Sequence, residues 1–283
     1  MKRLVTLAAA GIGLVALVFA SGAQAQSRPT AITIATEGAY APWNFTGPDG
    51  KPAGFEVDLA NDLCARMKLT CTIVTQDWEG LIPALTAGRF DVIMASMFIT
   101  HKRLEVINFS RSYAIDPSSF AVAKSSALAK AALSGKFDLN KEAEALPVIE
   151  KMRPLLKGQT IGVQTSTKNL DFVTKYFAGV VDVREYKTTE QHDLDLAAGR
   201  IDAIFAQQTS ITATVEKPGF ADYTIAGPGF VGGVFGRGTG AGLRKHDTVL
   251  LGMLNEAIGA AMADGTIKKL SEKWLKADVT PPQ

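Results

Sequence analysis

Short apolar runs alternate with amphipathic stretches along this chain, and one pattern of this kind occurs twice. Residues 87–96 read Ala-Gly-Arg-Phe-Asp-Val-Ile-Met-Ala-Ser, and residues 198–207 read Ala-Gly-Arg-Ile-Asp-Ala-Ile-Phe-Ala-Gln. In each copy a helix-like stretch leads into a polar Gly-Arg turn, and the apolar run that follows is too short for a helix and is typical of a buried strand. The chain is therefore predicted to build the same helix–turn–strand unit twice, in two similar lobes whose strand ends face each other.

The stretches around these units also alternate between the two kinds of element. Residues 31–36 have the pattern of a strand, residues 56–67 that of a helix, and residues 71–74 that of a second strand. Further strands are predicted at 160–163, 181–186 and 223–226. Strands that alternate with helices predict an α/β fold with mostly parallel sheets flanked by helices.

Two segments are predicted to cross between the lobes, residues 111–123 with Pro117, and residues 227–230. Residues 124–157 are rich in Ala, Leu, Lys and Glu and predict one or two surface helices that stop at Pro154. Helices over 249–275 are predicted to return to the first lobe. The predicted domains are lobe 1 at 26–114 and 229–283, and lobe 2 at 115–228 with a helical insertion at about 124–157.

Residues 1–25 have the composition of a cleavable secretory signal. Two cations precede an apolar core at residues 4–20, and residues 23–25 (Ala-Gln-Ala) have the spacing of a cleavage site. A membrane anchor is the alternative, but the run is short and ends in the processing motif. Position 26 is Gln and not Cys, so no lipid anchor is indicated. We predict export to the periplasm.

Cleavage after residue 25 leaves 283 − 25 = 258 residues, enough for two modest domains. It removes two of the 30 Lys and Arg residues and none of the 28 Asp and Glu residues, so the mature chain carries 28 of each sign. A neutral chain is a poor partner for nucleic acids or membrane surfaces, which attract basic proteins. Neither is predicted as a partner.

The two cysteines, Cys64 and Cys71, are predicted to form a structural disulfide, because an exported chain with an even cysteine count most simply pairs them. No His or further Cys lies near enough in sequence to suggest a metal site. The three histidines, His101, His192 and His246, have no metal-ligand spacing and are predicted to be solvated. A glycine-rich stretch at 236–242 lacks the strand–turn–helix context of a nucleotide site, so no cofactor is predicted.

Arg103 follows the first repeated unit at the expected strand end, where α/β proteins bind ligands. Its guanidinium fork suits a carboxylate. The alternative is an exposed arginine at a helix start that pairs with Glu105. The second predicted anion site is the stretch 164–168 (Gln-Thr-Ser-Thr-Lys), where hydroxyls meet a helix N-terminus. There the alternative is an ordinary helix cap.

Several of these motifs together resemble the periplasmic polar-amino-acid-binding proteins of ABC importers, which are bacterial extracellular solute-binding proteins of family 3. The resemblance spans essentially the whole mature chain. Residues 37–45 (Glu-Gly-x-Tyr-Ala-Pro-x-Asn-Phe), residues 93–97 (Ile-Met-Ala-x-Met) and the 124–157 insertion look closest to the nopaline and octopine receptors, the opine branch. The motifs that carry it are Glu37…Tyr40-Ala41-Pro42, the helix 56–67 with its Cys64/Cys71 pair, Trp78-x-x-Leu-Ile-Pro, Ala-Gly-Arg-x-Asp and Thr100-x-x-Arg103.

The resemblance implies a type II periplasmic-binding fold that captures a small zwitterion by hinge closure and delivers it, as a monomer, to an inner-membrane permease. It implies that Arg103 grips the α-carboxylate, that Tyr40 and Trp78 sandwich the ligand, and that Glu37 pairs with a distal cation. The implied ligand-binding residues are Glu37, Tyr40, Trp78, Ala95, Ser96, Phe98, Arg103, Ser118, Ser166, Thr167 and Gln207.

Two of these positions depart from the amino-acid branch of the family. Phe98 replaces a usual Ser or Gly, and Gln207 replaces an Asp that pairs with the ligand's α-ammonium; the opine binders are also neutral there. These departures favour an opine or a modified amino acid as the ligand. The alternative is a free basic amino acid: arginine, lysine, ornithine or histidine. A rival reading is an enzyme like the cyclohexadienyl dehydratases of the same fold, but no second poised acid is evident and no catalytic residue is predicted. A sensory receptor domain is disfavoured because no membrane segment follows the signal.

Overall fold

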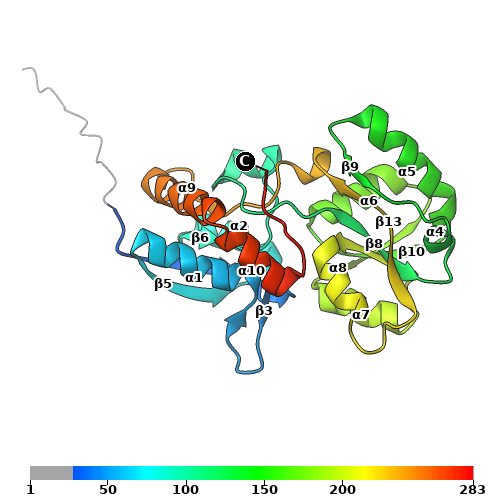
Figure 1. The fold of residues 1–283 in the computed structure, drawn as a ribbon, viewed down its shortest axis with the longest axis horizontal. Helices are drawn as coiled ribbons and strands as arrows, with labels where there is room; N and C mark the ends of the chain where they lie inside the picture. Colours follow the sequence, from blue (N-terminus) through cyan, green and yellow to red (C-terminus); the bar gives the residue numbers. More distant parts are fainter. Residues whose placement is uncertain (1–27, 283) are drawn as a thin grey trace, which may run out of the picture.

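Two lobes lie side by side in the computed structural model, joined by extended segments that cross between them (Figure 1). The structure describes residues 28–282, so the predicted signal peptide at 1–25 lies outside the described residues. We call the half that holds the first sheet lobe 1, and the half that holds the second sheet lobe 2.

Lobe 1 is built on a five-stranded sheet in the order β5-β1-β6-β14-β7. β1 pairs in parallel with both β5 and β6, whereas β14 is antiparallel to its neighbours. The strands are β1 (Ala31–Thr36), β5 (Thr70–Thr75), β6 (Val92–Ile93), β7 (Asn108–Phe109) and β14 (Gly242–Leu243), with a small sheet of β2 (Ala39–Tyr40), β3 (Asn44–Thr46) and β4 (Pro52–Ala53). The helices are α1 (Phe55–Met67), η1 (Trp78–Gly80), α2 (Leu81–Thr86), α3 (His101–Val106), α9 (Thr248–Ala263) and α10 (Thr266–Leu275).

Lobe 2 is built on a six-stranded sheet in the order β11-β10-β12-β8-β13-β9. β10 is parallel to β11 and β12, and β8 is antiparallel to both of its neighbours. The strands are β8 (Ser118–Ala123), β9 (Lys136–Asp138), β10 (Thr160–Gln164), β11 (Asp182–Tyr186), β12 (Ala203–Gln207) and β13 (Tyr223–Val231). The helices are α4 (Ala127–Lys130), α5 (Glu142–Leu156), α6 (Lys168–Phe177), α7 (Thr189–Ala197), α8 (Gln208–Val215) and η2 (Gly233–Phe235).

The α/β prediction is confirmed, and the strands that run against the parallel core are the first strands after the two crossings. β8 begins directly after the first crossing, and β14 is the first strand after the second. A chain that enters a lobe at the cleft must run away from it, whereas the parallel core strands run toward it. β13 continues to Val231, beyond the boundary predicted after residue 228.

The insertion at 124–157 differs from its prediction. It contributes the edge strand β9, whose Phe137 lies beside Phe230 of β13, as well as helices. α5 runs through Pro147 and Pro154 and ends at Leu156, so the predicted stop at Pro154 is wrong. The apolar face of α5 is buried in lobe 2, and this packing holds the helix together past the missing N–H groups.

The repeated helix–turn–strand unit is confirmed in both lobes. Gly88 and Gly199 adopt positive φ angles of 74° and 65° in the two turns, where glycine carries no steric cost. The aspartate three residues after each glycine makes the same hydrogen bond in both copies. Asp91 Oδ2 accepts from the N–H of Thr33 at 2.9 Å, and Asp202 Oδ2 accepts from the N–H of Thr160 at 2.7 Å. Each aspartate therefore fastens its strand to the neighbouring parallel strand.

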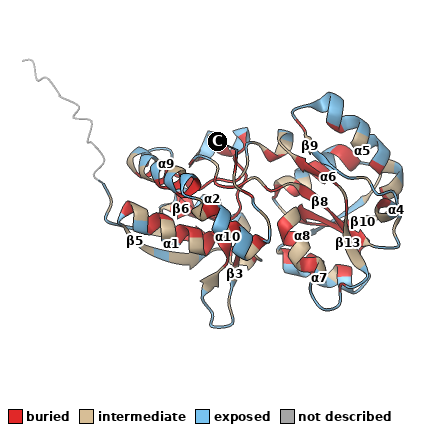
Figure 2. Ribbon diagram, in the orientation of Figure 1, coloured by how far each residue is buried: buried red, intermediate tan, exposed pale blue. Residues whose placement is uncertain are grey.

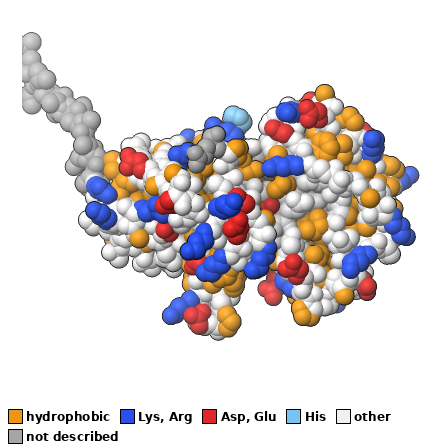
Figure 3. Space-filling model, in the orientation of Figure 1, with side chains coloured by type: hydrophobic (Ala, Val, Ile, Leu, Met, Phe, Trp, Pro, Cys, Tyr) orange, Lys and Arg blue, Asp and Glu red, His pale blue; other side chains and the backbone are white. Residues whose placement is uncertain are grey.

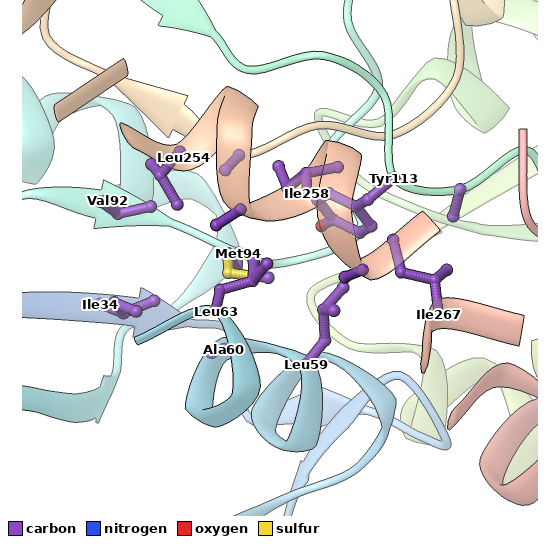
Figure 4. Packing of buried hydrophobic residues seen from close by; sticks show 14 of the residues in the cluster. Ile34, Leu59, Ala60, Leu63, Val92, Met94, Tyr113, Leu254, Ile258 and Ile267 are labelled. Atoms are coloured by element: carbon purple, nitrogen blue, oxygen red, sulfur yellow. The ribbon is translucent and has the colours of Figure 1, made fainter. Parts of the chain in front are cut away.

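Each lobe has its own apolar core between sheet and helices (Figure 2). In lobe 1, Leu59 and Leu63 of α1 meet Leu254 and Ile258 of α9 above the sheet (Figure 4). On the face shown in Figure 3, basic and acidic side chains are interspersed over both lobes. Within residues 28–282 no helix is long and apolar enough to cross a membrane.

The predicted disulfide joins Cys64, near the end of α1, to Cys71 in β5, with the two Cα atoms 6.2 Å apart. It closes a loop with a sequence separation of seven residues at the far end of the lobe 1 core. No cavity residue belongs to this loop. The crosslink is structural.

Replacing both cysteines with serine is expected to lower the free energy of unfolding by about 2 kcal/mol, because the unfolded chain regains the entropy of the open loop. The measurement is urea denaturation of the oxidised protein and the Cys64→Ser/Cys71→Ser variant. Equal midpoints at equal slopes would contradict a stabilising role.

Candidate functional site

A cavity of about 410 Å³, counted with its mouth, lies between the lobes at the carboxyl ends of the central parallel strands. This is the position at which α/β folds bind ligands. Lobe 1 lines it from the loops after β1, β5 and β6 and from α3, and lobe 2 from β10, β12 and the starts of α6 and α7. The lining residues are Glu37, Tyr40, Trp78, Ala95, Ser96, Phe98, Arg103, Gln164, Thr167, Lys168, Asn169, Thr189, His192, Phe205, Ala206 and Gln207.

Ser96 and Gln207 occupy the same position in the two copies of the repeat, and they meet across the cavity. The Ser96 hydroxyl donates to Oε1 of Gln207 at 2.7 Å, and the Tyr40 hydroxyl donates to the same oxygen at 3.0 Å. The prediction that the two strand ends face each other is confirmed at the level of these equivalent residues.

Ser96 is held in a left-handed conformation, with φ 49°, by a buried carboxylate. The Ser96 N–H donates to Oε1 of Glu56 at 2.6 Å. The Glu56 carboxylate also accepts from Asn44 Nδ2 at 2.7 Å and from the Tyr113 hydroxyl. Burial raises the pKa of Glu56, and these hydrogen bonds offset part of the rise. Glu56 supports the site from outside the cavity, and nothing in its sequence distinguishes it from a solvated acid at a helix start.

Glu37 follows β1 and is 7 % exposed. Gln164 donates from Nε2 to its Oε1 at 2.6 Å, which joins lobe 2 to lobe 1. Burial raises the pKa of Glu37 to about 7; the Gln164 hydrogen bond opposes the rise, and the charges of Glu56 and Asp77 add to it. Glu37 is thus a carboxylate whose charged form lacks a full partner.

Arg103 points into the cavity from α3, which Thr100 caps through the Arg103 N–H. Its Nη1 donates to the Phe98 carbonyl at 3.0 Å, and the guanidinium carbon lies 5.2 Å from the centre of the Trp78 ring. Burial lowers the pKa of Arg103 to about 10, so the side chain keeps its charge at neutral pH. The arginine is 9 % exposed and does not lie on the surface beside Glu105.

The other predicted ligand-binding residues divide into two groups. Ala95, Phe98 and Thr167 line the cavity, with Thr167 as the cap of α6. Ser118 and Ser166 do not. Ser118 donates to Oδ1 of Asn169 at 2.7 Å, and Ser166 donates to Oε1 of Glu79 at 3.0 Å, across the lobes.

Gln164 and Lys168 also line the cavity, and they belong to the stretch 164–168 that was predicted as an anion site. The sequence reasoning missed five further lining residues, all from lobe 2: Asn169, Thr189, His192, Phe205 and Ala206. The prediction that His192 is solvated is wrong: it is 1 % exposed, because it faces inward from α7. The second repeat ends next to several of these residues, and this was the one sequence signal for them.

A second set of contacts joins the lobes outside the cavity. Trp43 of lobe 1 donates from Nε1 to the Thr209 hydroxyl at 2.8 Å, and that hydroxyl donates to Oδ2 of Asp116 at 2.6 Å. Asp116 lies in the first crossing and also accepts from the N–H of Thr209. We call this chain of three residues the Trp43–Thr209–Asp116 latch. Burial raises the pKa of Asp116 to about 7, against the two hydrogen bonds from Thr209.

This two-lobed α/β architecture with a polar cavity at the meeting strand ends defines a solute-binding protein of the periplasmic type. Residues 32–277 match the model of the bacterial extracellular solute-binding proteins, family 3, and the chain belongs to that family.

The chain is 46 % identical over 286 residues to the octopine-binding periplasmic protein of Rhizobium meliloti, covering 94 % of this chain and 97 % of the relative. It is 34 % identical over 283 residues to the histidine-binding periplasmic protein of Escherichia coli K12, covering 99 % of both. Among solved structures, an ancestral arginine-binding protein bound to arginine superimposes with a TM-score of 0.73 at 26 % identity, covering 88 % of this chain and 99 % of the other. These relatives are named as binding proteins, and the chain is a binding protein and not an enzyme.

Trp43→Phe is expected to shift the protein away from the arrangement with the lobes in contact, because it removes one buried interlobe hydrogen bond, worth about 1 kcal/mol or roughly fivefold in the equilibrium. Small-angle X-ray scattering should show a larger radius of gyration. Trp274→Phe is the matched control, because Trp274 Nε1 donates to Asp58 within lobe 1. A control that expands as much as Trp43→Phe would contradict the latch.

Proposed function

We propose that this protein is the periplasmic receptor of an ABC importer and captures an opine or an arginine-like amino-acid derivative between its lobes. One observation carries the proposal: the cavity buries a cation, Arg103, and an anion, Glu37, that do not pair with each other. Within residues 28–282 neither forms an ion pair; Arg103 donates to a backbone carbonyl and Glu37 accepts from an amide.

A buried charge without a charged partner is costly, and a ligand of opposite charge relieves that cost. The Arg103 fork suits a carboxylate, and Ser96 of lobe 1 and Thr167 of lobe 2 line the same cavity. Glu37 suits a guanidinium or ammonium group. A zwitterion with an anionic head and a cationic tail satisfies both, and its binding would hold the lobes together.

The contacts of Tyr40 and Trp78 differ from the ligand sandwich that the family resemblance implies for them. Trp78 contacts the Arg103 guanidinium, and its Nε1 donates to the Ser166 carbonyl of lobe 2 at 3.3 Å. Tyr40 is tied to Gln207. We propose that both close the walls around the ligand and that Trp78 keeps the Arg103 fork in place.

The relatives support a basic amino acid or a derivative of one, since those named above bind octopine, histidine and arginine. The α-ammonium of a free amino acid would need an anionic partner at position 207, and Gln207 is neutral. This favours an opine as the ligand, and a free basic amino acid is the alternative. The signal-like residues 1–25 and the periplasmic relatives support a periplasmic location. We propose that the receptor is a monomer and that the permease recognises the lobes in their closed arrangement.

The proposal is tested by calorimetry with L-arginine, L-lysine, L-histidine and octopine, and by mass spectrometry of solute released from the purified protein. Thermal shifts provide a second readout, because a ligand at 100 times its dissociation constant adds about 2.7 kcal/mol of stability. Failure of every compound in the panel to bind would refute the proposed ligand class.

Arg103→Ala is expected to weaken each carboxylate ligand by about 3 kcal/mol, roughly 100-fold, because the buried anion loses its partner. Arg89→Ala is the matched control, because Arg89 is exposed in the first Gly-Arg turn. This substitution removes the same charge at a position away from the cavity. An unchanged dissociation constant for Arg103→Ala in calorimetry would remove this residue from the binding site.

Affinity for a cationic ligand is expected to fall as the pH drops below about 7, the raised pKa of Glu37. A carboxyl with a raised pKa is protonated below that value, and the ligand's cation must displace the proton. The loss approaches tenfold per pH unit, about the effect of one linked proton. Calorimetry between pH 8 and pH 5.5 measures it, and Glu37→Gln should bind weakly at every pH. A flat profile in the native protein would show that Glu37 does not hold the cation.

A further inference from the structure

A second cavity lies beside the two crossings, outside the cavity between the lobes. Its volume is about 720 Å³, counted with its mouth, and Phe98 lines both cavities. We call it the hinge cavity, because its walls come from lobe 1, lobe 2, the first crossing and the segment that leads from η2 back to lobe 1. The lining residues that matter for its chemistry are Phe98, Ile115, Asp116, Asp138, Phe235 and Arg237.

Asp116 presents a buried carboxylate to the hinge cavity. It is 3 % exposed, and its Oδ2 accepts from the N–H and the hydroxyl of Thr209 at 3.1 and 2.6 Å. Within residues 28–282 its Oδ1 accepts no hydrogen bond, and the carboxylate forms no ion pair. The charge of Lys136 lowers the pKa of Asp116 without an ion pair between the two, and burial raises it more strongly. Asp116 is therefore a buried anion with one free oxygen at a cavity wall.

Aromatic side chains form an apolar wall of the same cavity. The rings of Phe98 and Phe235 lie with their centroids 5.4 Å apart and their planes at 50°, and both side chains are buried. Ile115, next to Asp116 in the first crossing, adds an aliphatic side chain. Ring faces attract cations, and an apolar wall favours a ligand with an apolar body.

The other charged residues in the lining leave the cavity acidic. Asp138 is half-buried, and its Oδ1 accepts from the N–H and Nδ2 of Asn140 at 2.9 and 2.8 Å. Arg237 is exposed, so water screens its charge, whereas the charge of Asp116 is buried. The hinge cavity therefore favours a cation over an anion.

We propose that the hinge cavity is a second ligand site and binds an organic monocation, an amidinium or an ammonium group on an apolar body. The charged group donates to Oδ1 of Asp116, and the apolar body packs against Phe98 and Phe235. The site is separate from the proposed function, because it uses neither Arg103 nor Glu37.

A cation in this site is coupled to the meeting of the lobes. Asp116 belongs to the Trp43–Thr209–Asp116 latch, and the walls of the hinge cavity come from both lobes. The shape of the site therefore depends on how the lobes are arranged, and a ligand that binds one arrangement better shifts the protein toward it.

The test is a titration with benzamidine, a flat aromatic amidinium, followed by the NMR signals of the indole N–H groups. The three tryptophans report on different places. Trp43 Nε1 donates to Thr209 in the latch, Trp78 Nε1 to the Ser166 carbonyl across the ligand cavity, and Trp274 Nε1 to Asp58 within lobe 1. Trp→Phe variants assign the signals. Benzamidine is expected to shift the Trp43 signal saturably and to leave the Trp274 signal in place.

Four variants assign the response to the hinge cavity. Asp116→Asn keeps an oxygen for Thr209 and removes the charge, so it should weaken benzamidine about tenfold or more. Arg237→Gln removes an exposed like charge and should strengthen binding about twofold. Asp182→Asn is the matched control, because Asp182 is exposed in β11, and it should change nothing. Glu37→Gln should keep the Trp43 response, because its carboxylate belongs to the other cavity.

The outcomes separate the hinge site from the ligand site between the lobes. A Trp43 response that is lost in Glu37→Gln and kept in Asp116→Asn would place benzamidine between the lobes and overturn the hinge site, as would no saturable response at millimolar benzamidine. Either result leaves the proposed function standing. The thermal unfolding midpoint of each variant is measured first. If Asp116→Asn does not fold, Arg237→Gln decides: tighter binding supports the site, and unchanged or weaker binding overturns it.

Discussion

The arrangement of this protein depends on two parallel strand ends that meet across a cleft. β6 and β12 come from the same sequence pattern. Ser96, three residues after β6, hydrogen-bonds to Gln207, the last residue of β12. Strand ends expose backbone and small side chains that no sheet partner covers, so each lobe alone would leave these groups to water. The facing lobe covers these groups, and the cavity between the lobes is polar because they line it.

Buried charge is the second constraint, and it explains why the cleft binds a solute. Glu56 is fully satisfied by three hydrogen bonds and acts as a support for Ser96. Glu37 and Arg103, in contrast, are buried, and within residues 28–282 the side chain of each has only one neutral hydrogen-bond partner. A satisfied buried charge holds the fold, whereas a poorly satisfied one provides free energy for a ligand.

The contacts between the lobes are divided by function. The Trp43–Thr209–Asp116 latch joins lobe 1, lobe 2 and the first crossing without contributing a residue to the cavity. The interlobe contacts of Gln207 and Gln164, in contrast, are made by residues that line the cavity. The lobes therefore meet through two sets of contacts, one inside the cavity and one outside it.

The sequence alone determined the fold class, the two lobes and the disulfide, because repeats, turns and cysteine pairing can be recognised from local patterns. Arg103 was predicted from its place at a strand end, and the other lobe 1 residues of the candidate site were implied by the family resemblance. Burial and hydrogen-bond orientation are not local, and only the tertiary structure decided them. It placed His192 inside, put Trp78 on Arg103 and ran α5 past Pro154. It also made Oε1 of Gln207 the acceptor for two hydroxyls of lobe 1. The Gln207 contacts depend on side chains more than 100 residues away, since Ser96 and Gln207 are separated by 111 residues.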